Sequence, residues 1–196
     1  MSEIFVTSDL HFFHNNILKY NAISRPFNTI EEMNDVIISN WNNMITLKDK
    51  TYILGDISFG PAGKTAELLQ QLNGTKILIK GNHDSSYLKN DLILNCFESI
   101  HDYYELKYNK QFICMFHFPI EMWNRKHYGG LHFHGHTHSI NQELNQRRID
   151  VGLDGNNLLP YNIDDVVEKL LQPFPLQAVM YMSNRTVTVV ARYNKP

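Results

Sequence analysis

Apolar runs of two kinds alternate along the chain, and their spacing predicts strands and helices in turn. Short runs rich in β-branched and aromatic residues predict buried strands, and they lie at residues 4–7, 51–54, 76–79, 103–108, 111–116 and 131–133. Elsewhere apolar residues recur at helical spacing, as do Met33, Ile37 and Trp41, whose side chains we expect to pack in a core. Thr29 and Glu32 form a capping-box pattern just before them, which predicts where this helix begins.

The rest of the chain continues this alternation. Further helices are expected near residues 68–72, over 85–97 and over 162–171, and residues 103–108 and 111–116 are expected to pair as a hairpin. Residues 147–153 are the expected partner strand of 131–133, and residues 178–193 are expected to form a closing hairpin turned at Asn184-Arg185 that completes a sheet. No internal repeat or linker interrupts the pattern, so we expect a single domain of the α/β (α+β) class over residues 1–196.

Composition narrows the class of protein. The chain has 196 residues, 43% of them hydrophobic, and a formal net charge of -2, which is typical of a globular domain. No long basic run is present, so we expect no strong nucleic-acid binding, and an anionic substrate would have to be attracted by a local site. Cys96 and Cys114 are expected to be reduced thiols. No signal-peptide pattern or membrane-length apolar stretch is present, so we expect a cytoplasmic protein without a membrane anchor.

Polar residues of metal-binding types follow five of the expected strands. In chain order these residues are Asp9 and His11, Asp56, Asn82 and His83, His117, and His136 and His138. Each signal alone is weak, because Gly55-Asp56 and Gly81-Asn82 are also ordinary turn sequences. Ligands in open α/β sheets collect beyond the carboxyl ends of the strands, however, so five coincident strand ends predict a metal site there.

These blocks, in this order, resemble the calcineurin-like metallophosphoesterase family. The blocks that carry the resemblance are Asp-x-His, Gly-Asp, Gly-Asn-His-Asp, a single His and Gly-His-x-His, and the resemblance covers about residues 1–170. It implies a four-layer αββα sandwich, in which two mixed β-sheets are flanked by helices and the metal site lies at the C-terminal ends of the strands. We identify the chain on these motifs as a small, bacterial-type single-domain member.

The resemblance also implies a role for each motif residue. One metal would bind Asp9, His11, Asp56 and His138, and the other would bind Asp56, Asn82, His117 and His136. Asp56 would bridge the two metals, since a carboxylate has two oxygens and can hold two ions about 3.5–4 Å apart. Imidazole and carboxylate ligands suit Mn, Fe, Zn or Ni, of which we expect two Mn ions.

The expected reaction is hydrolysis of a phosphomonoester or phosphodiester, with a preference for a diester of nucleotide type. A hydroxide that bridges the metals would attack phosphorus, and His83 would assist the leaving group. The expected partners are a small phosphate-ester substrate and at most a second copy of the chain. The alternatives are an inactive binding or scaffold protein with this fold and a nuclease, the latter disfavoured by the acidic net charge.

Other polar residues near these motifs are candidates for substrate binding or support. Arg25 and His14 follow the first motif and are expected to bind substrate, because a guanidinium can hold phosphate through two hydrogen bonds. Asp84 is expected to anchor its loop or cap the next helix. His134 is a candidate to support the metal ligands. Residues 123–127 would form either a rim over the pocket or a solvated loop anchored by Trp123.

Overall fold

The computed structural model describes residues 2–141, 147–172, 177–183 and 186–192, with the strands of 177–192 described by their backbone alone. In the described chain the α-helices are α1 (Ile17–Tyr20), α2 (Ile30–Met44), α3 (Ala62–Gln71), α4 (Asp91–Leu94) and α5 (Ile163–Leu171). Short 3₁₀ turns lie at η1 (Asp84–Ser86), η2 (Lys126–Tyr128) and η4 (Leu153–Gly155). No helix in these ranges is both long enough and apolar enough to span a bilayer.

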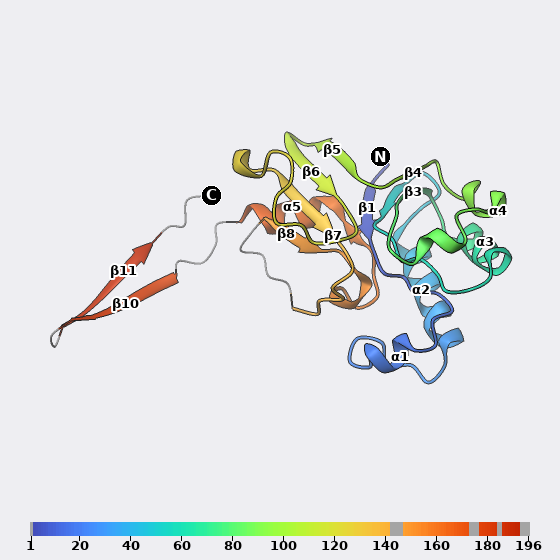
Figure 1. The fold of residues 1–196 in the computed structure, drawn as a ribbon, viewed down its shortest axis with the longest axis horizontal. Helices are drawn as coiled ribbons and strands as arrows, with labels where there is room; N and C mark the ends of the chain where they lie inside the picture. Colours follow the sequence, from blue (N-terminus) through green and yellow to red (C-terminus); the bar gives the residue numbers. More distant parts are fainter. Residues whose placement is uncertain (1, 142–146, 173–176, 184–185, 193–196) are drawn as a thin grey trace.

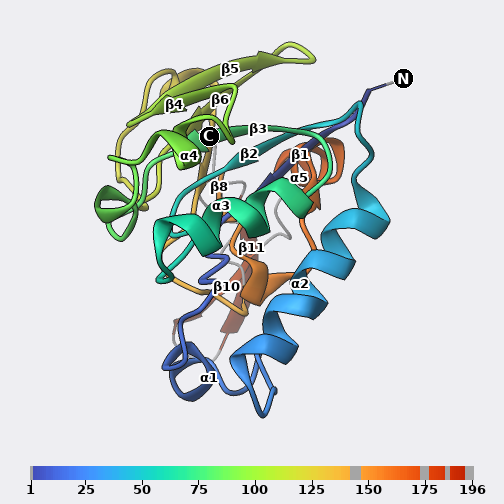
Figure 2. The same cartoon turned by 90° about the vertical axis from the view of Figure 1, so that its right-hand side faces the viewer.

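The first sheet has the strand order β4-β3-β2-β1-β9, and its strands are parallel except for β9 at one edge. Its members are β1 (Ile4–Thr7), β2 (Lys50–Ile53), β3 (Thr75–Ile79), β4 (Ser99–His101) and β9 (Tyr161–Asn162). Helices α2 and α3 lie across one face of it (Figure 2). Parallel strands point their carboxyl ends to the same edge, so the loops after β1, β2 and β3 meet there.

The second sheet has the order β5-β6-β7-β8, with β5 antiparallel and the other strands parallel (Figure 1). Its members are β5 (Tyr104–Tyr108), β6 (Gln111–Met115), β7 (Leu131–His134) and β8 (Arg148–Asp150). A bridge between Ser8 and Gly152 links the end of β1 to the end of β8. The carboxyl ends of both sheets therefore meet, and the expected arrangement of two mixed sheets flanked by helices is confirmed.

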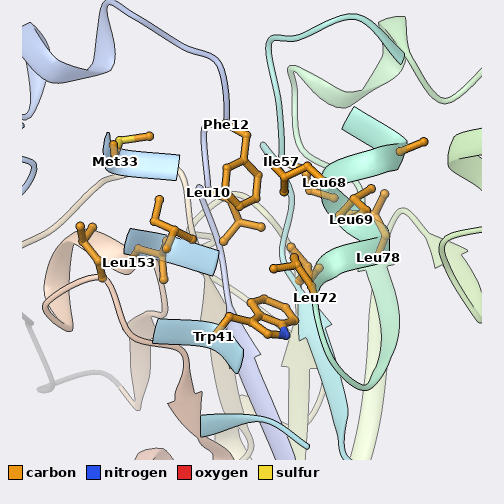
Figure 3. Packing of buried hydrophobic residues seen from close by; sticks show 14 of the residues in the cluster. Leu10, Phe12, Met33, Trp41, Ile57, Leu68, Leu69, Leu72, Leu78 and Leu153 are labelled. Carbon is orange, nitrogen blue, oxygen red and sulfur yellow. The ribbon is translucent and has the colours of Figure 1, made fainter. Parts of the chain in front are cut away.

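Two apolar cores hold these layers together. One lies between the first sheet and helices α2 and α3, and Figure 3 shows Trp41 and Leu69 within it. Trp41 is fully buried, as expected, and its Nε1 donates to the Asn73 carbonyl at 3.0 Å. The other core joins the facing sides of the two sheets and the apolar side of α5. Each fully buried Leu or Phe contributes about 1.5–3 kcal/mol relative to exposure.

Local sequence signals account for several element ends. The Thr29 side chain accepts from the Glu32 amide, while the Glu32 carboxylate accepts from the Thr29 amide, so the expected capping box is confirmed. The Asn162 side chain likewise caps α5 by accepting from the Asp164 amide. Asn109 and Lys110, which join β5 to β6, both have positive φ, as a tight hairpin turn requires.

The structure differs from the expected elements at two places. Residues 85–97 do not form one helix, because the Asn90 side chain caps the separate short helix α4 by accepting from the Leu92 amide. The three-residue strand β4 pairs with β3 and was not expected from its sequence. Among the described strands, β10 (Gln177–Ser183) and β11 (Thr186–Arg192) pair with each other, as the expected hairpin does, and its completion of a sheet stays a prediction. Its expected turn at 184–185 lies outside the described residues.

Candidate metal centre

The loops that follow β1, β2, β3, β6 and β7 converge at one place and are held together by their backbones. The amides of Asp9 and His11 donate to the carbonyls of Gly55 and Asp56 at 3.0 and 3.1 Å. The Gly135 amide donates to the His117 carbonyl at 2.9 Å, and the His136 amide donates to the Asp9 carboxylate at 2.9 Å. The two sheets thus place their candidate ligands in one shared site.

A first group consists of Asp9, His11 and His138, whose candidate ligand atoms all lie within 4.8 Å of one another. Asp9 Oδ1 lies 3.7 Å from Nε2 of both histidines, which is too far for a hydrogen bond. Within the described part of the chain, the buried atoms Asp9 Oδ1 and His11 Nε2 have no hydrogen-bond partner. Buried polar atoms left unpaired cost free energy, and a bound metal would remove that cost.

A second group consists of Asp56, His117 and His136. His117 is fully buried, and its Nε2 lies 3.5 Å from Asp56 Oδ2 and 2.9 Å from Asn82 Oδ1. The His136 ring lies 5.2 Å from the His117 ring and is exposed to solvent. Six of the seven candidate ligand residues therefore belong to these two groups, and the seventh, Asn82, lies beside the second.

Asp56 lies between the two groups. Its Oδ2 is 3.5 Å from His117 Nε2 on one side and 3.9 Å from His11 Nε2 on the other. The same oxygen is 3.8 Å from Nε2 of His83, and Asp56 Oδ1 accepts from the His83 amide at 3.0 Å. This central position matches the bridging role that the resemblance implies.

Three of the histidines are oriented through Nδ1, which leaves Nε2 facing the carboxylates. His117 Nδ1 lies 2.6 Å from the Leu54 carbonyl, and His138 Nδ1 lies 2.8 Å from the Asp154 carboxylate. His11 Nδ1 lies 3.1 Å from His14 Nδ1. When Nδ1 carries the proton, Nε2 presents a free lone pair, which is the form that binds a metal.

The backbone at this site is strained. Asp9, His11, Asp56, His136 and His138 all have φ between 49° and 69°. Non-glycine residues rarely adopt this left-handed region, which costs on the order of 1–3 kcal/mol each and is concentrated at functional sites. Close packing adds a second constraint, because a Cβ on Gly81 would lie 2.6 Å from the Asp56 amide nitrogen.

The electrostatics of the site favour an ionised Asp9 and neutral rings at His11 and His14, but a charged ring at His138. Burial raises the pKa of Asp9, but its contact with His11 and the charges of nearby histidines outweigh this and lower the pKa to about 2. Burial lowers the pKa of His11, and it lowers the pKa of His14 to about 4. For His138, burial opposes the charged form, yet the Asp154 hydrogen bond and the Asp9 charge raise its pKa.

Arg25 does not lie where a substrate can reach it. Its side chain is fully buried and forms an ion pair with Asp154, with Nη2 2.8 Å from Oδ2. The guanidinium also donates to the carbonyls of Asp9 and Leu10. The expectation that Arg25 binds substrate is therefore corrected, because its hydrogen-bonding capacity is used inside the protein. His14 lies at the site edge against His11, and its contact with substrate stays a prediction.

Asp84 anchors the loops that carry the candidate ligands, which is the first of the two roles expected for it. The buried carboxylate accepts from the amides of Asp56, Ile57 and Gly81 at 2.7–3.0 Å, and from the Tyr87 hydroxyl. His134 Nδ1 lies 2.9 Å from the carbonyl of Gly135 in the ligand loop, so it also has a supporting position.

The 123–127 segment is an anchored loop. Trp123 is 7% exposed, and its Nε1 donates to the Gly130 carbonyl at 3.0 Å. Lys126 Nζ lies over the Trp123 ring, and the Arg125 guanidinium lies over the Phe112 ring. These contacts support the anchored-loop alternative of the two that the sequence allowed.

Two supporting carboxylates were not anticipated. Asp154 orients His138 and pairs with Arg25, while Asp150 accepts from the Thr137 hydroxyl and the Ser139 amide in the loop that carries His136 and His138. Asp150 ends β8 and Asp154 follows it in η4, within Asp150-Val151-Gly152-Leu153-Asp154. The sequence signal was a sixth polar strand end, at β8, which has no histidine.

Comparisons with known proteins agree with this geometry. The family model described as calcineurin-like phosphoesterase matches residues 2–154. An uncharacterized protein of Methanocaldococcus jannaschii, MJ1445, is 35% identical over 176 residues, which cover 86% of this chain and 91% of that protein. The gene 66 protein of Mycobacterium phage D29 is 29% identical over 199 residues, covering 86% and 96%.

A solved structure shows a similar fold. The protein AQ665 of Aquifex aeolicus, described as of unknown function, has a TM-score of 0.70 and 25% sequence identity. The similarity covers 87% of this chain and 100% of that one.

Proposed function

The chain belongs to the calcineurin-like phosphoesterase family, and on this premise we propose that it is a binuclear metal-dependent hydrolase of phosphate esters. The observation that carries the proposal is the pair of buried, unpartnered ligand atoms, Asp9 Oδ1 and His11 Nε2, among the described residues. His11 Nε2 lies 3.7 Å from Asp9 Oδ1 and 3.9 Å from Asp56 Oδ2, and these atoms belong to a donor set of carboxylates, imidazoles and one amide.

This donor set fits two divalent ions. Asp9, His11 and His138 would hold one metal, and Asn82, His117 and His136 would hold the other, with Asp56 shared. Nitrogen and oxygen donors without thiolate suit Mn, Fe, Zn or Ni, and we propose Mn as the working metal. The positive charge of two divalent ions exceeds the negative charge of the two carboxylates, and the Asn82 amide adds no charge. A loaded site therefore attracts an anionic phosphate.

The protein's own groups would position the reaction. A pair of divalent metals supplies Lewis-acid chemistry, which generates a hydroxide nucleophile near neutral pH and neutralises phosphoryl charge. His83 is held by its amide on Asp56, and its side chain is 45% exposed at the edge of the site. Its ring is therefore accessible to a bound ester, and we assign it the transfer of a proton to the leaving oxygen.

We propose a preference for diesters over monoesters. A dianionic monoester needs more positive charge around its terminal oxygens than a monoanionic diester does. Among the described residues, the hydrogen bonds and ion pairs of the site reach one cationic side chain, Arg25, which is fully buried. The absence of an exposed cationic side chain among these contacts of the described residues supports the proposed preference for diesters.

The test is hydrolysis of bis(p-nitrophenyl) phosphate and p-nitrophenyl phosphate by protein loaded with Mn. Turnover is expected for both, faster for the diester, with a loss of at least about 100-fold in Asp56→Asn and in His83→Ala. Asp35→Asn, which changes an exposed carboxylate on α2, is the matched control and should keep full activity. No turnover across a wider ester panel, despite two bound metals per chain, would overturn the proposal and leave a binding protein with this fold.

A further inference from the structure

Two exposed aromatic side chains lie against the candidate metal centre. Phe59, in the loop after Asp56, is 42% exposed, and Phe118, directly after His117, is 37% exposed. Phe118 packs against the rings of His117 and His136 at 5.0 and 4.7 Å. Each ring therefore offers a flat apolar surface beside the site on which a ligand could pack.

Phe59 lies on the side of the site where the proposed leaving group would be. Its ring centre is 4.7 Å from that of His83 and 5.3 Å from that of His11. It stacks on His14 at 3.8 Å with an interplanar angle of 14°. The His14 and Phe59 rings therefore form a nearly parallel pair next to the proposed proton donor.

Backbone hydrogen bonds hold the main chain of Phe59, and stacking on His14 supports its ring. The Phe59 amide donates to the Phe12 carbonyl at 2.9 Å, and the Phe12 amide donates to the Ile57 carbonyl at 2.9 Å. These bonds join the loop after β2 to the loop after β1, which carries His11 and His14. A ring fixed before binding loses little conformational entropy when a ligand stacks on it.

We propose that Phe59, stacked on His14, binds a planar aromatic ring carried by the leaving group of the substrate. The ring would be a nucleobase or an aryl group, since both present a flat π-face. This inference rests on the proposed function, because it uses His83 to locate the leaving group. It goes further by naming the substrate class and the residue that selects it.

The test uses phosphonates, in which carbon replaces the ester oxygen and no hydrolysis takes place. Phenylphosphonate and cyclohexylphosphonate carry the same anion on a flat ring and on a puckered ring of similar size. Calorimetric titration of the Mn-loaded protein should show phenylphosphonate binding about tenfold more tightly. Phe59→Leu should abolish this preference, and Phe59→Trp should keep it.

Tyr128→Leu is the matched control, because Tyr128 is 87% exposed and lies in η2 rather than beside the metal ligands. It should retain the wild-type preference. Metal content is measured for every variant, and binding is expressed per loaded site, so that a loss of metal in Phe59→Leu is not mistaken for a loss of stacking. A preference that survives in Phe59→Leu would overturn the proposal.

A second pair of ligands separates the two sources of the ring. The methylenephosphonate analogues of adenosine monophosphate and of ribose 5-phosphate differ only by the base. A preference for the first of about tenfold, lost in Phe59→Leu, supports a nucleobase, whereas a preference limited to phenylphosphonate supports an aryl group. If the phosphonates bind without any ring preference, the stacking proposal fails while the phosphoesterase proposal stands. If none binds to the loaded protein while bis(p-nitrophenyl) phosphate is still hydrolysed, the stacking proposal alone fails, and if there is neither binding nor hydrolysis, both proposals fail.

Discussion

Arg25 and Asp154 form a fully buried ion pair between residues 129 positions apart in the sequence. The guanidinium Nε and Nη2 donate to the two carboxylate oxygens at 2.9 and 2.8 Å. The oxygen that accepts from Nη2 lies 2.8 Å from His138 Nδ1 as well. The pair therefore links the core of the protein to the orientation of one candidate metal ligand.

Arg25→Gln should lower the free energy of unfolding by about 3–5 kcal/mol, because it leaves the Asp154 charge buried without its partner. Urea denaturation measures this loss. The half-exposed ion pair of Lys50 and Glu98, with side chains 33% and 48% exposed, provides the control. Lys50→Gln should cost less than about 1 kcal/mol. Equal losses in the two variants would contradict the stabilising role of the buried pair.

His138→Ala and His136→Ala should weaken different metal sites. His138 groups with Asp9 and His11, whereas His136 groups with Asp56 and His117. Titration of metal-free protein with Mn should show two binding events in the wild type and one weakened event in each variant. The double variant should lose both events, and loss of the same event in the two single variants would refute the assignment.

Gly81→Ala should lower metal affinity on the order of 10–100-fold, the typical effect of disturbing the support of a ligand. The added Cβ would clash with the backbone and carboxylate of Asp56, neither of which is free to move. Gly63→Ala is the control, because no atom lies within 4 Å of its Cβ and it is in α3. That variant should bind metal normally and be more stable by about 0.5–1 kcal/mol.

His132 should make stability depend on pH in the acid range. Burial lowers its pKa to about 4, while an unfolded histidine titrates near 6.5. Its contribution is therefore complete above pH 6.5 and is lost as the pH falls to 4, because the unfolded chain takes up the proton first. The difference amounts to about 3 kcal/mol over this window at 1.36 kcal/mol per unit.

Urea denaturation of metal-free protein between pH 7 and pH 4 measures this effect. His132→Gln should be less stable than the wild type at pH 7 and should lose less stability on acidification. The neutral ring fits its surroundings, since Nδ1 lies 3.1 Å from the Cys114 carbonyl and Nε2 accepts from the Ile120 amide at 3.3 Å. Parallel pH profiles for the two proteins would show that His132 is not the titrating group.

Features encoded in a few neighbouring residues were predictable from the sequence. The capping box at Thr29 and the turn at Asn109-Lys110 each depend on contacts within four residues, and both were confirmed. Convergence of the strand ends was also predictable, because parallel strands share one carboxyl edge whatever their side chains are. The grouping of Asp9 with His138 was implied by the family resemblance, and the structure brings the two residues together.

Features that depend on distant residues were not predictable. Arg25 lies close in sequence to exposed residues, so its burial was not expected. Only the fold shows that it forms a buried ion pair with Asp154. The left-handed backbone of the ligands was equally hidden, because aspartate and histidine adopt it more often than other side chains do but signal it far more weakly than glycine. The position of Phe59 beside His83 likewise results from pairing between two loops.

Contacts between residues far apart in the sequence also determine when the candidate metal centre can form during synthesis. Asp9 accepts a hydrogen bond from His136, 127 residues later, and Asp154 follows further still. A ribosome adds about 5–20 residues per second, so the first candidate ligand waits roughly ten seconds or more for its last support. Nascent chains that end before Asp154 should therefore bind no metal tightly. Metal uptake should mark the end of folding.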